Sequence, residues 1–460
     1  MDAPLHSSVA ARAVTARMPT TPTRQFALNV VVPLRADGRA ELDAVLARIS
    51  DETTSAMRKA PVPNALLDFA QVPGIHYARW VVVPGRGDPY QSPGGRPASP
   101  PPPTPDALAL NVWFDGTEGD ASAVEAEARA GFVKAFVAAG RHALDAIYTH
   151  AEGYPAGGRD EAVAAYLLEH HVGASALYFG SPGRSVGQIL EEAALARKVR
   201  SVVDELRARG PLLDAPAVRR VILDAVGESI PPFPAQKPAW GSLLARAPLA
   251  ALAVPASALL PWLLVLENTD PVFQPVYSAA ERAHVDTTTR GENLFFENAL
   301  SNVVEVKPGL FRRTLLRAVL FAIDTLARDY FVRGSLGKIP SIHAAHWYLL
   351  DGGRRLVFVS NYDSSWESYL GDFIDQAGTG LTAVWSNTSG YPRTHFLAFA
   401  GSNAGNQFKA WSHHVQVGTR VWYAAYPDLS IVEINDATMI RRGLADDRAV
   451  RPETWLAKLL

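Results

Sequence analysis

Apolar and polar positions along the chain predict strands and helices in alternation. Runs rich in β-branched and aromatic residues indicate strands, whereas apolar residues three or four positions apart indicate helices. In the first half, these patterns predict strands over 26–32, 75–83, 108–114, 144–149 and 176–179, and helices over 40–49, 121–139, 160–171 and 186–206. In the second half, they predict strands over 302–306, 342–350, 356–361, 381–385, 395–399 and 419–426, and helices over 311–331, 366–377 and 406–414.

The second half of the chain repeats short motifs of the first half in the same order. Ile-His-Tyr-Ala-Arg-Trp at 75–80 matches Ile-His-Ala-Ala-His-Trp at 342–347, and Gly-Tyr-Pro occurs at both 153–155 and 390–392. The other matching pairs are 114–116 with 362–364, 146–148 with 383–385, and 170–172 with 413–415. Ordered matches of this kind predict an internal duplication.

Each copy has the element order βαββαβ followed by a further αβ or βαβ unit, which is the order of a ferredoxin-like sheet with helices on one face. We therefore expect an α+β fold in which two duplicated ferredoxin-like units pack as a pseudo-twofold α+β barrel with an inserted apolar helical arm. The expected parts are a disordered tail (1–24), the first copy (25–206), a linker with the apolar arm (207–297), the second copy (298–446) and a C-terminal tail (447–460).

This element order and duplication resemble the dimeric α+β barrel superfamily, which includes the dye-decolourising peroxidases. The resemblance covers about three quarters of the chain and implies a barrel with a central apolar cavity. The Gly-x-x-Asp-Gly motif of those peroxidases is absent. Three motifs are also similar to those of bacterial proteins of unassigned function: Ile-His-x-Ala-Arg-Trp, Asn-Tyr-Asp and Glu-Gly-Tyr-Pro.

Composition narrows the classes of function. The 460 residues are 48% hydrophobic and 20% charged, with a formal net charge of −2, so no basic field suggests a nucleic-acid partner. The chain has no cysteine, which excludes disulfides, zinc–thiolate sites and thiol nucleophiles. Phosphate-binding loops, His-Glu-x-x-His and Gly-x-Ser-x-Gly are also absent, which argues against P-loop enzymes, zincins and α/β-hydrolases.

The segment 247–266 contains twenty residues without a charge, the length of a bilayer span. Its three prolines argue against a regular spanning helix, so we expect an interfacial hairpin or a buried arm. The basic, apolar helix at 310–331 is of the kind that lies on anionic lipid, although a core helix with a solvated Arg face shows the same pattern. The expected membrane-contact residues are Trp262, Leu263, Leu264, Arg312 and Arg313. The predicted location is cytoplasmic, or peripheral at the inner face of the membrane.

Histidines repeat in both copies. His76 and His343 lie in predicted strands, where alternation places His76, Ala78 and Trp80 on one face. Each could contact a ligand or serve as a structural hydrogen-bonding residue. Pairs at 170–171 and 413–414 end predicted helices, where cationic His is favoured by the helix dipole. The functional alternative is that His414 binds haem iron as an axial ligand.

Asp115 and Asp363 close strands and precede predicted helices, so N-capping of those helices is one explanation. The other is catalytic, since peroxide cleavage needs an acid or a cation near the iron. On that hypothesis Asp363, Arg393 and His343 are the catalytic residues.

The leading hypothesis is thus a haem-dependent, peroxidase-like redox protein that acts on peroxide or a small apolar ligand. The alternative is a non-enzymatic, membrane-associated module that binds lipid or another apolar ligand. The sequence leaves open whether the chain is an enzyme and what its oligomeric state is.

Overall fold

The computed structural model describes residues 18–85, 104–210, 214–226, 230–234, 260–273, 279–290, 293, 295–330, 339, 341–376, 378–397, 399–401 and 404–459. The fold is α+β with antiparallel sheets. Most of the predicted apolar arm at 247–266 lies outside the described residues.

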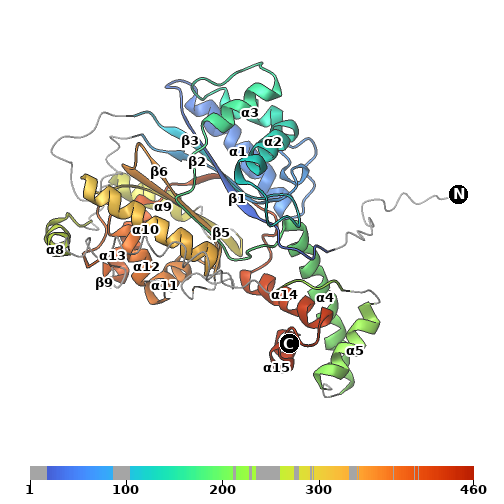
Figure 1. The fold of residues 1–460 in the computed structure, drawn as a ribbon. Helices are drawn as coiled ribbons and strands as arrows, with labels where there is room; N and C mark the ends of the chain where they lie inside the picture. The colour runs from blue at the N-terminus through green and yellow to red at the C-terminus, as the bar shows by residue number, and fades with distance from the viewer. Residues whose placement is uncertain are drawn as a thin grey trace.

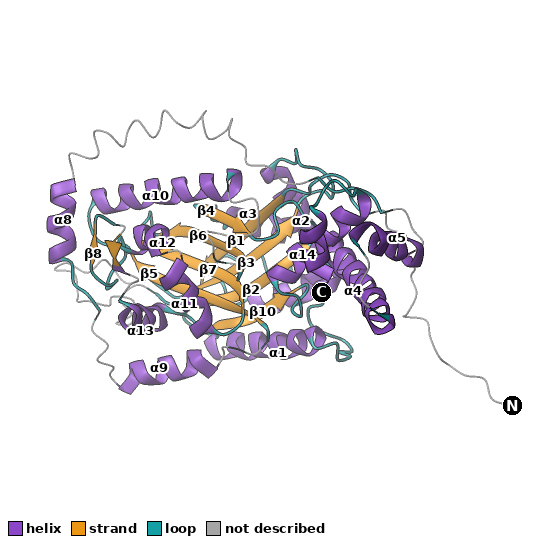
Figure 2. Cartoon of the chain, turned by 90° about the horizontal axis from the view of Figure 1, so that it is seen from below, coloured by secondary structure: helices purple, strands orange, loops and turns teal. Residues whose placement is uncertain are grey.

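Two four-stranded sheets form the centre of the molecule (Figures 1 and 2). The first has the order β1-β3-β2-β10, and the second has the order β4-β6-β7-β5. The strands of the first sheet are β1 (Gln25–Pro33), β2 (Ile75–Val83), β3 (Ala107–Asp115) and β10 (Thr419–Ala424). Those of the second are β4 (Ala176–Phe179), β5 (Glu297–Glu305), β6 (Ile342–Leu350) and β7 (Arg355–Asp363). Each sheet therefore takes its fourth strand from the opposite half of the chain, and the two halves are not separate domains.

Helices cover the outer face of each sheet. The first sheet lies under α1 (Arg39–Met57), α2 (Glu125–Tyr148) and α3 (Asp160–Glu169). The second lies under α10 (Leu310–Asp329), α11 (Trp366–Gln376), α12 (Gly378–Trp385) and α13 (Gly405–Val415). A third core lies between the two sheets and includes Tyr77, Trp113, Val303 and Tyr348. The layers are thus helix, sheet, sheet and helix (Figure 1).

A helical layer projects from one end of the sheets (Figure 1). It contains α4 (Val186–Arg209), α5 (Ala215–Val226), α14 (Ile431–Ala445) and α15 (Pro452–Leu459). A buried ion pair joins α4 to α14, since Arg441 Nη1 donates to Glu192 Oε1 over 2.8 Å. Short elements complete the fold: the 3-10 turn Phe69–Gln71, α8 (Leu260–Thr269), α9 (Ala279–Arg290), β8 (Thr394–His395) and β9 (Phe399–Ala400).

Three predicted strands are wrong or reduced. Residues 144–149 form the last turns of α2, and residues 381–385 lie in α12. Both are short apolar runs, and such runs do not distinguish a strand from a buried helix segment. The predicted strand at 395–399 is instead a small hairpin between β8 and β9. No helix in the described ranges is long and apolar enough to span a membrane.

Candidate functional site

A β-bulge in each sheet turns a histidine toward the space between the sheets. The pairing of β2 with β3 shifts register between Ile75 and Tyr77, and that of β6 with β7 shifts between Ile342 and Ala344. A bulge interrupts strict alternation, so His76 faces Tyr426 and Tyr77, whereas Ala78 and Trp80 pack under the helices. The expectation that His76 shares a face with Ala78 and Trp80 was therefore wrong.

Each of these histidines contacts an aspartate that also binds the start of a helix. His76 Nε2 lies 2.8 Å from Asp115 Oδ1, and Asp115 Oδ2 accepts a 2.8 Å bond from the backbone N–H of Val186 in α4. In the second sheet, His343 Nε2 lies 2.6 Å from Asp363 Oδ1. Asp363 Oδ2 then accepts a 2.9 Å bond from the N–H of Ile431 in α14.

The aspartates thus lie at the positive ends of helix dipoles, but at helices far along the chain. The helix that follows Asp363 is served by other groups, since Ser365 accepts from the N–H of Ser368 and Asn293 accepts from that of Trp366. Capping of the next helix was therefore the wrong assignment for Asp363.

Two tyrosines join the histidines across the space between the sheets. His76 Nδ1 lies 2.7 Å from the hydroxyl of Tyr426, and the hydroxyl of Tyr77 lies 3.0 Å from His343 Nδ1. The rings of the two tyrosines pack edge to face, with centroids 5.6 Å apart. Burial raises the pKa of both hydroxyls well above the ordinary value, so both carry protons at neutral pH. Each His–Asp pair therefore ends on a tyrosine in the space between the sheets.

Glu297 makes the surroundings of His343 different from those of His76. It begins β5 at the position that corresponds to Gln25 at the start of β1, and its side chain is fully buried. Its Oε1 lies 3.5 Å from His343 Nδ1, and neither of its carboxyl oxygens has a hydrogen-bond partner among the described residues. Burial raises the pKa of Glu297 to about 8, against the opposing effect of His343. Glu297 is therefore largely protonated at neutral pH.

The pKa of His343 depends on burial and on two neighbouring carboxyl groups. Burial alone would lower its pKa, but the charges of Glu297 and Asp363 outweigh burial and raise it. The protonation states of Glu297 and His343 therefore depend on each other, since an ionised Glu297 favours the charged form of His343. Gln25 gives His76 no ionisable partner: its Nε2 lies 3.2 Å from His76 Nε2 and donates to the Arg184 carbonyl over 2.8 Å, but an amide cannot ionise.

Arg79 is a fully buried cation in the same space. Its guanidinium donates to the carbonyls of Leu300 and Ser360, to the Ser301 hydroxyl and to the Asn361 side chain. None of these acceptors is charged, and no carboxylate in the described residues forms a salt bridge with it. Burial lowers the pKa of Arg79 to about 9. An unpaired buried cation is costly, so an anion beside Arg79 would be strongly favoured.

Several neutral polar groups surround Arg79. The Arg79 Cζ atom lies 5.1 Å from the centre of the Trp113 ring, which lies 4.5 Å from the ring of His346. Burial lowers the pKa of His346 well below the ordinary value, and the nearby Arg79 charge lowers it further, so this imidazole is neutral. Its Nε2 donates to Asn29 over 2.6 Å. Arg79 Nε, Trp113 Nε1 and His346 Nδ1 are buried without a hydrogen-bond partner, as expected where a ligand or ordered water completes the site.

A surface cavity of about 450 Å³ approaches this layer from one side. Ala299, in its wall, lies between Glu297 and Ser301 on the same face of β5. Trp422, also in the wall, donates to the Asn361 oxygen that holds Arg79. The cavity also contains the cationic side chains of Arg39 and Arg420, each paired with an aspartate. We call this cavity, together with Glu297 and Arg79, the inter-sheet site.

The catalytic residues predicted from the sequence are only partly brought together. His343 and Asp363 are in contact, but Arg393 is exposed before β8, where its carbonyl accepts from Gly401. No described contact joins Arg393 to Asp363. Sequence reasoning did not select Glu297, Tyr77 or Tyr426. The available signal was the departure from the repeat, because Glu297 corresponds to Gln25, and Arg79 to His346.

His414, the predicted haem ligand, is buried near the end of α13 with its ring 4.6 Å from the ring of Phe273. In the described part of the chain, no group of three metal-binding side chains occurs. The adjacent His413 stacks on Trp366 with ring centroids 3.6 Å apart. Haem binding stays a prediction.

The predicted membrane-contact residues differ in exposure. Trp262 is 51% exposed, whereas Leu263 is buried at 3%. Arg312 is also buried and donates to Asp270 over 2.5 Å; Leu264 and Arg313 are half-buried. Leu263 and Arg312 therefore have structural roles and cannot contact lipid as they lie.

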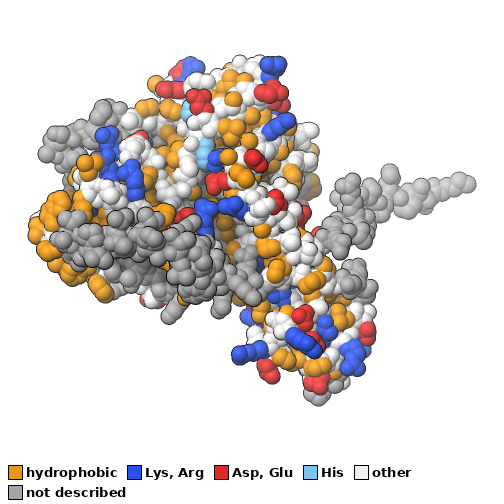
Figure 3. Space-filling view, viewed as in Figure 1, with side chains coloured by type: hydrophobic (Ala, Val, Ile, Leu, Met, Phe, Trp, Pro, Cys, Tyr) orange, Lys and Arg blue, Asp and Glu red, His pale blue; other side chains and the backbone are white. Residues whose placement is uncertain are grey.

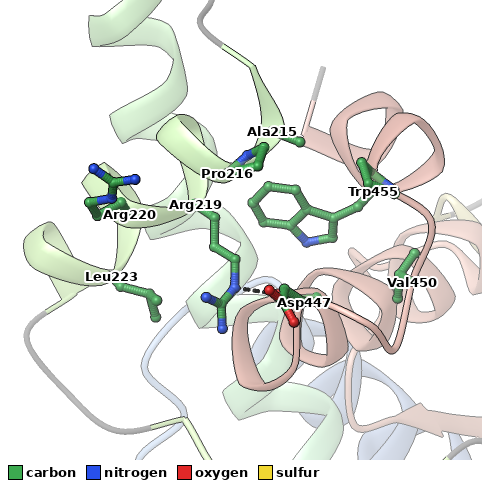
Figure 4. A pocket seen from close by; sticks show the side chains of 10 residues that line it. Ala215, Pro216, Arg219, Arg220, Leu223, Asp447, Val450 and Trp455 are labelled. Carbon is green, nitrogen blue, oxygen red and sulfur yellow. Dashed lines mark hydrogen bonds between the residues drawn. The ribbon is translucent and has the colours of Figure 1, made fainter.

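A separate cavity of about 270 Å³ lies in the helical layer, between α5 and α15 (Figure 4). Arg219 extends along it and donates to the carbonyls of Gly443 and Leu444 at the end of α14. This is a C-terminal helix cap, so the Arg219 side chain has a structural explanation.

Comparisons with family models, with curated proteins and with solved structures gave no match to this chain. The chemistry of the inter-sheet site is therefore the basis for assigning a function.

Proposed function

We propose that the protein is an enzyme that binds a small organic anion in the inter-sheet site and transfers a proton to or from it. The observation that carries the proposal is a pair of buried ionisable groups at one strand: Glu297, a protonated carboxyl that begins β5, and Arg79, a guanidinium without a salt bridge that bonds Leu300 and Ser301 of β5. Strongly perturbed ionisable groups of this kind cluster at functional sites.

Arg79 supplies the binding energy for the negative group. Four of its N–H bonds are held by neutral acceptors on β5 and β7, which fixes the plane of the guanidinium, and its Nε–H remains for a ligand. In a buried setting such a charge-assisted hydrogen bond is worth more than in water. Trp113 Nε1 offers a second donor nearby.

Glu297 supplies the acid–base function. A group whose pKa lies near the working pH can both donate and accept a proton, which is the requirement for general acid–base catalysis. His343 lies 3.5 Å away, and the negative charge of an ionised Glu297 raises the pKa of its imidazole. Asp363 holds the far nitrogen of His343 and so fixes the orientation of its ring.

We infer that the two sheets are copies of one ferredoxin-like unit that pack as a pseudo-twofold α+β barrel. The shared order of strand pairing, the bulge at His76 and at His343, and the two Asp–helix contacts support this view. On this view the site lies at the barrel centre. Duplication would also explain how one copy retained Gln25 while the other acquired Glu297.

The binding part of the proposal is tested with a panel of small carboxylates and inorganic phosphate in a thermal-shift assay. At least one anion should raise the melting temperature saturably, and Arg79→Gln should abolish that rise. Gly418→Trp should do the same, because Gly418 lines the cavity and has free space at its Cβ position. The matched control is Ala121→Trp, which fills a different cavity beside Gln25.

The chemical part is tested with the anion that binds. Deuterium incorporation at its acidic C–H positions is followed in D₂O by mass spectrometry. Glu297→Gln should retain binding and lose exchange by about 10²-fold or more. If no anion binds, or if Arg79→Gln binds as well as the parent, the proposal is wrong. If an anion binds but its exchange is unchanged in Glu297→Gln, the protein would be a binding protein and not the proposed enzyme.

A second candidate function is association with a membrane surface. It is favoured by exposed apolar side chains that gather where α8 lies (Figure 3). They are Trp262, Val265, Leu310, Phe396 and Phe399. Co-sedimentation with anionic liposomes, weakened by Trp262→Ala with Val265→Ser, would support it. A protein that stays in the supernatant would exclude it.

A further inference from the structure

Buried polar atoms of two opposite kinds lack a partner around Arg79. Among the described residues, the donors are Arg79 Nε, Trp113 Nε1 and Asn361 Nδ2, and the atoms of the other kind are Asn111 Oδ1 and His346 Nδ1. An ionised carboxylate accepts hydrogen bonds but donates none, so it satisfies only the donors. We propose that the anion of the inter-sheet site is a hydroxy acid, whose carboxylate accepts from Arg79 and whose hydroxyl donates to His346. This inference rests on the proposed function, because it names the substrate class of the same site.

The hydrogen bonds of His346 leave its Nδ1 as an acceptor. The Nδ2 atom of Asn29 donates to the Val172 carbonyl over 3.0 Å, so the Asn29 oxygen is the atom that faces His346. An amide oxygen only accepts, which places the imidazole proton on His346 Nε2, 2.6 Å away. The imidazole is neutral, because burial and the Arg79 charge lower its pKa. Its Nδ1 therefore carries a lone pair and no proton.

The oxygen of Asn111 is a second acceptor on the same side of the first sheet. The Nδ2 atom of Asn111 donates to Asn29 Oδ1 over 2.9 Å and to the Tyr348 hydroxyl over 3.2 Å. These two bonds fix the orientation of the amide and use both of its protons. Asn111 pairs with Arg79 across β2 and β3, and paired residues project to the same face of a sheet. A ligand beside Arg79 therefore meets this oxygen as well.

Trp113 contacts both the cation and the acceptor imidazole. The centre of its ring lies 5.1 Å from Arg79 Cζ, and its centroid lies 4.5 Å from that of His346. All three side chains are fully buried. A small molecule that accepts from Trp113 Nε1 therefore lies next to a positive charge and next to an acceptor nitrogen. A carboxylate and a hydroxyl on neighbouring carbon atoms match this spacing of unlike groups.

The charge of Arg79 distinguishes a hydroxyl from an ammonium group. An amino acid also combines a carboxylate with donors, but its ammonium would be a second cation buried near Arg79. Like charges repel strongly where water is excluded. The same repulsion already disfavours a proton on His346 Nδ1. A hydroxyl supplies the required proton without a charge, so the site favours a hydroxy acid over an amino acid.

The sequence repeat explains why the two groups face each other. Arg79 and His346 occupy corresponding positions in the two motifs at 75–80 and 342–347. Each reaches across to the other sheet, since Arg79 donates to Ser301 of β5 and His346 donates to Asn29 of β1. Two arginines at these positions would give a site with two cations, and two histidines would give a site without a permanent charge. The difference between the copies thus provides one group for the carboxylate and one for the hydroxyl.

The test compares acids that differ by a single hydroxyl group. Lactate is paired with propionate, glycolate with acetate, and malate with succinate, and each dissociation constant is measured by isothermal titration calorimetry with the full chain. At least one hydroxy acid should bind about tenfold more tightly than its partner, since the partner leaves a buried acceptor without a hydrogen bond. Alanine, which has an ammonium in place of the hydroxyl of lactate, should bind more weakly than lactate.

Two variants of His346 locate the contact. His346→Leu should remove the preference for the hydroxy acid and leave the affinity for its partner nearly unchanged. His346→Asn should retain most of the preference, because the amide oxygen is attached to Cγ as Nδ1 is. The matched control is His170→Leu, the same substitution at the end of α3, where the ring lies 2.9 Å from the Tyr166 carbonyl. This variant should bind like the parent.

The outcomes separate this inference from the proposed function. Equal binding within every pair overturns the hydroxy acid and leaves the anion site in place, with water on the acceptors. A preference that persists in His346→Leu, or tighter binding of alanine than of lactate, also overturns it. If none of these acids binds, the proposed function itself fails. The comparison of ligands in the parent decides the question even if His346→Leu does not fold, which circular dichroism would show.

Discussion

Replacing Glu297 by Gln should make the protein more stable at alkaline pH, although it alters a buried residue. The folded protein raises the pKa of Glu297 from 4.5 to about 8, so it holds this proton more tightly than the unfolded chain does. Between these two pH values the folded state binds more protons, and the free energy of unfolding falls as the pH rises. Gln resembles the protonated carboxyl in shape and does not titrate, so the variant should lack this loss.

The size of the effect follows from the pKa difference. About 3.5 pH units at roughly 1.4 kcal/mol each give about 5 kcal/mol by pH 8. This is an upper bound, because His343 becomes charged more readily when Glu297 ionises and so offsets part of the cost. For 460 residues the entropy of unfolding is about 1 kcal/mol per degree. The melting temperature of the variant should therefore exceed that of the parent by up to about 5 °C at pH 8.

The assay is scanning fluorimetry of both proteins from pH 5 to pH 9. The two melting temperatures should nearly coincide at the lowest pH and separate as the pH rises. The matched control is Glu192→Gln, a buried carboxylate paired with Arg441 over 2.8 Å, which should lower stability by about 3–5 kcal/mol because it leaves the Arg441 cation unpaired. A Glu297→Gln protein that melts at or below the parent at pH 8 would refute the reasoning.

Three further predictions concern other parts of the molecule. Gly443→Ala should destabilise the helical layer by about 1–3 kcal/mol, because a Cβ atom there would lie 2.2 Å from the Trp455 ring; a melting temperature equal to that of the parent would contradict the close packing. Ser430→Ala should cost about 1 kcal/mol by removing the capping box at the start of α14, as measured by denaturant unfolding, and an unchanged midpoint would show that the cap is dispensable. The visible spectrum of protein expressed with iron and a haem precursor tests the haem prediction, since a Soret band lost in His414→Ala would support it and a parent without any band would refute it.

The sequence predicted those parts of the fold that depend on local patterns. The strands at 75–83 and 176–179 have the predicted bounds, because β-branched and aromatic runs next to turn residues have few alternatives. The segment 144–149 was mistaken for a strand because its apolar run is also one face of a long helix. The exchange of β4 and β10 between the sheets could not be predicted, since no local pattern encodes which strand pairs with which.

The candidate site was harder to predict than the fold. His343 and Asp363 were selected because they repeat, and they do meet. Glu297 was assigned to the end of a linker, so its burial among groups more than forty positions away was not visible. Tyr77 corresponds to Ala344 in the repeat, so the repeat did not mark it. The bulge that turns His76 toward Tyr77 depends on pairing across the sheet. The residues that break the repeat, and not those that preserve it, carry the chemistry of the site.

The most direct test of the central claim is an infrared titration of Glu297 in the full chain. The account predicts the carbonyl band of a protonated carboxyl at pH 7 that disappears with a midpoint near pH 8 and is missing from Glu297→Gln. In Arg79→Gln the midpoint should move upward, because the nearby cation lowers the pKa of Glu297. A Glu297 that is already ionised at pH 6 would contradict the account.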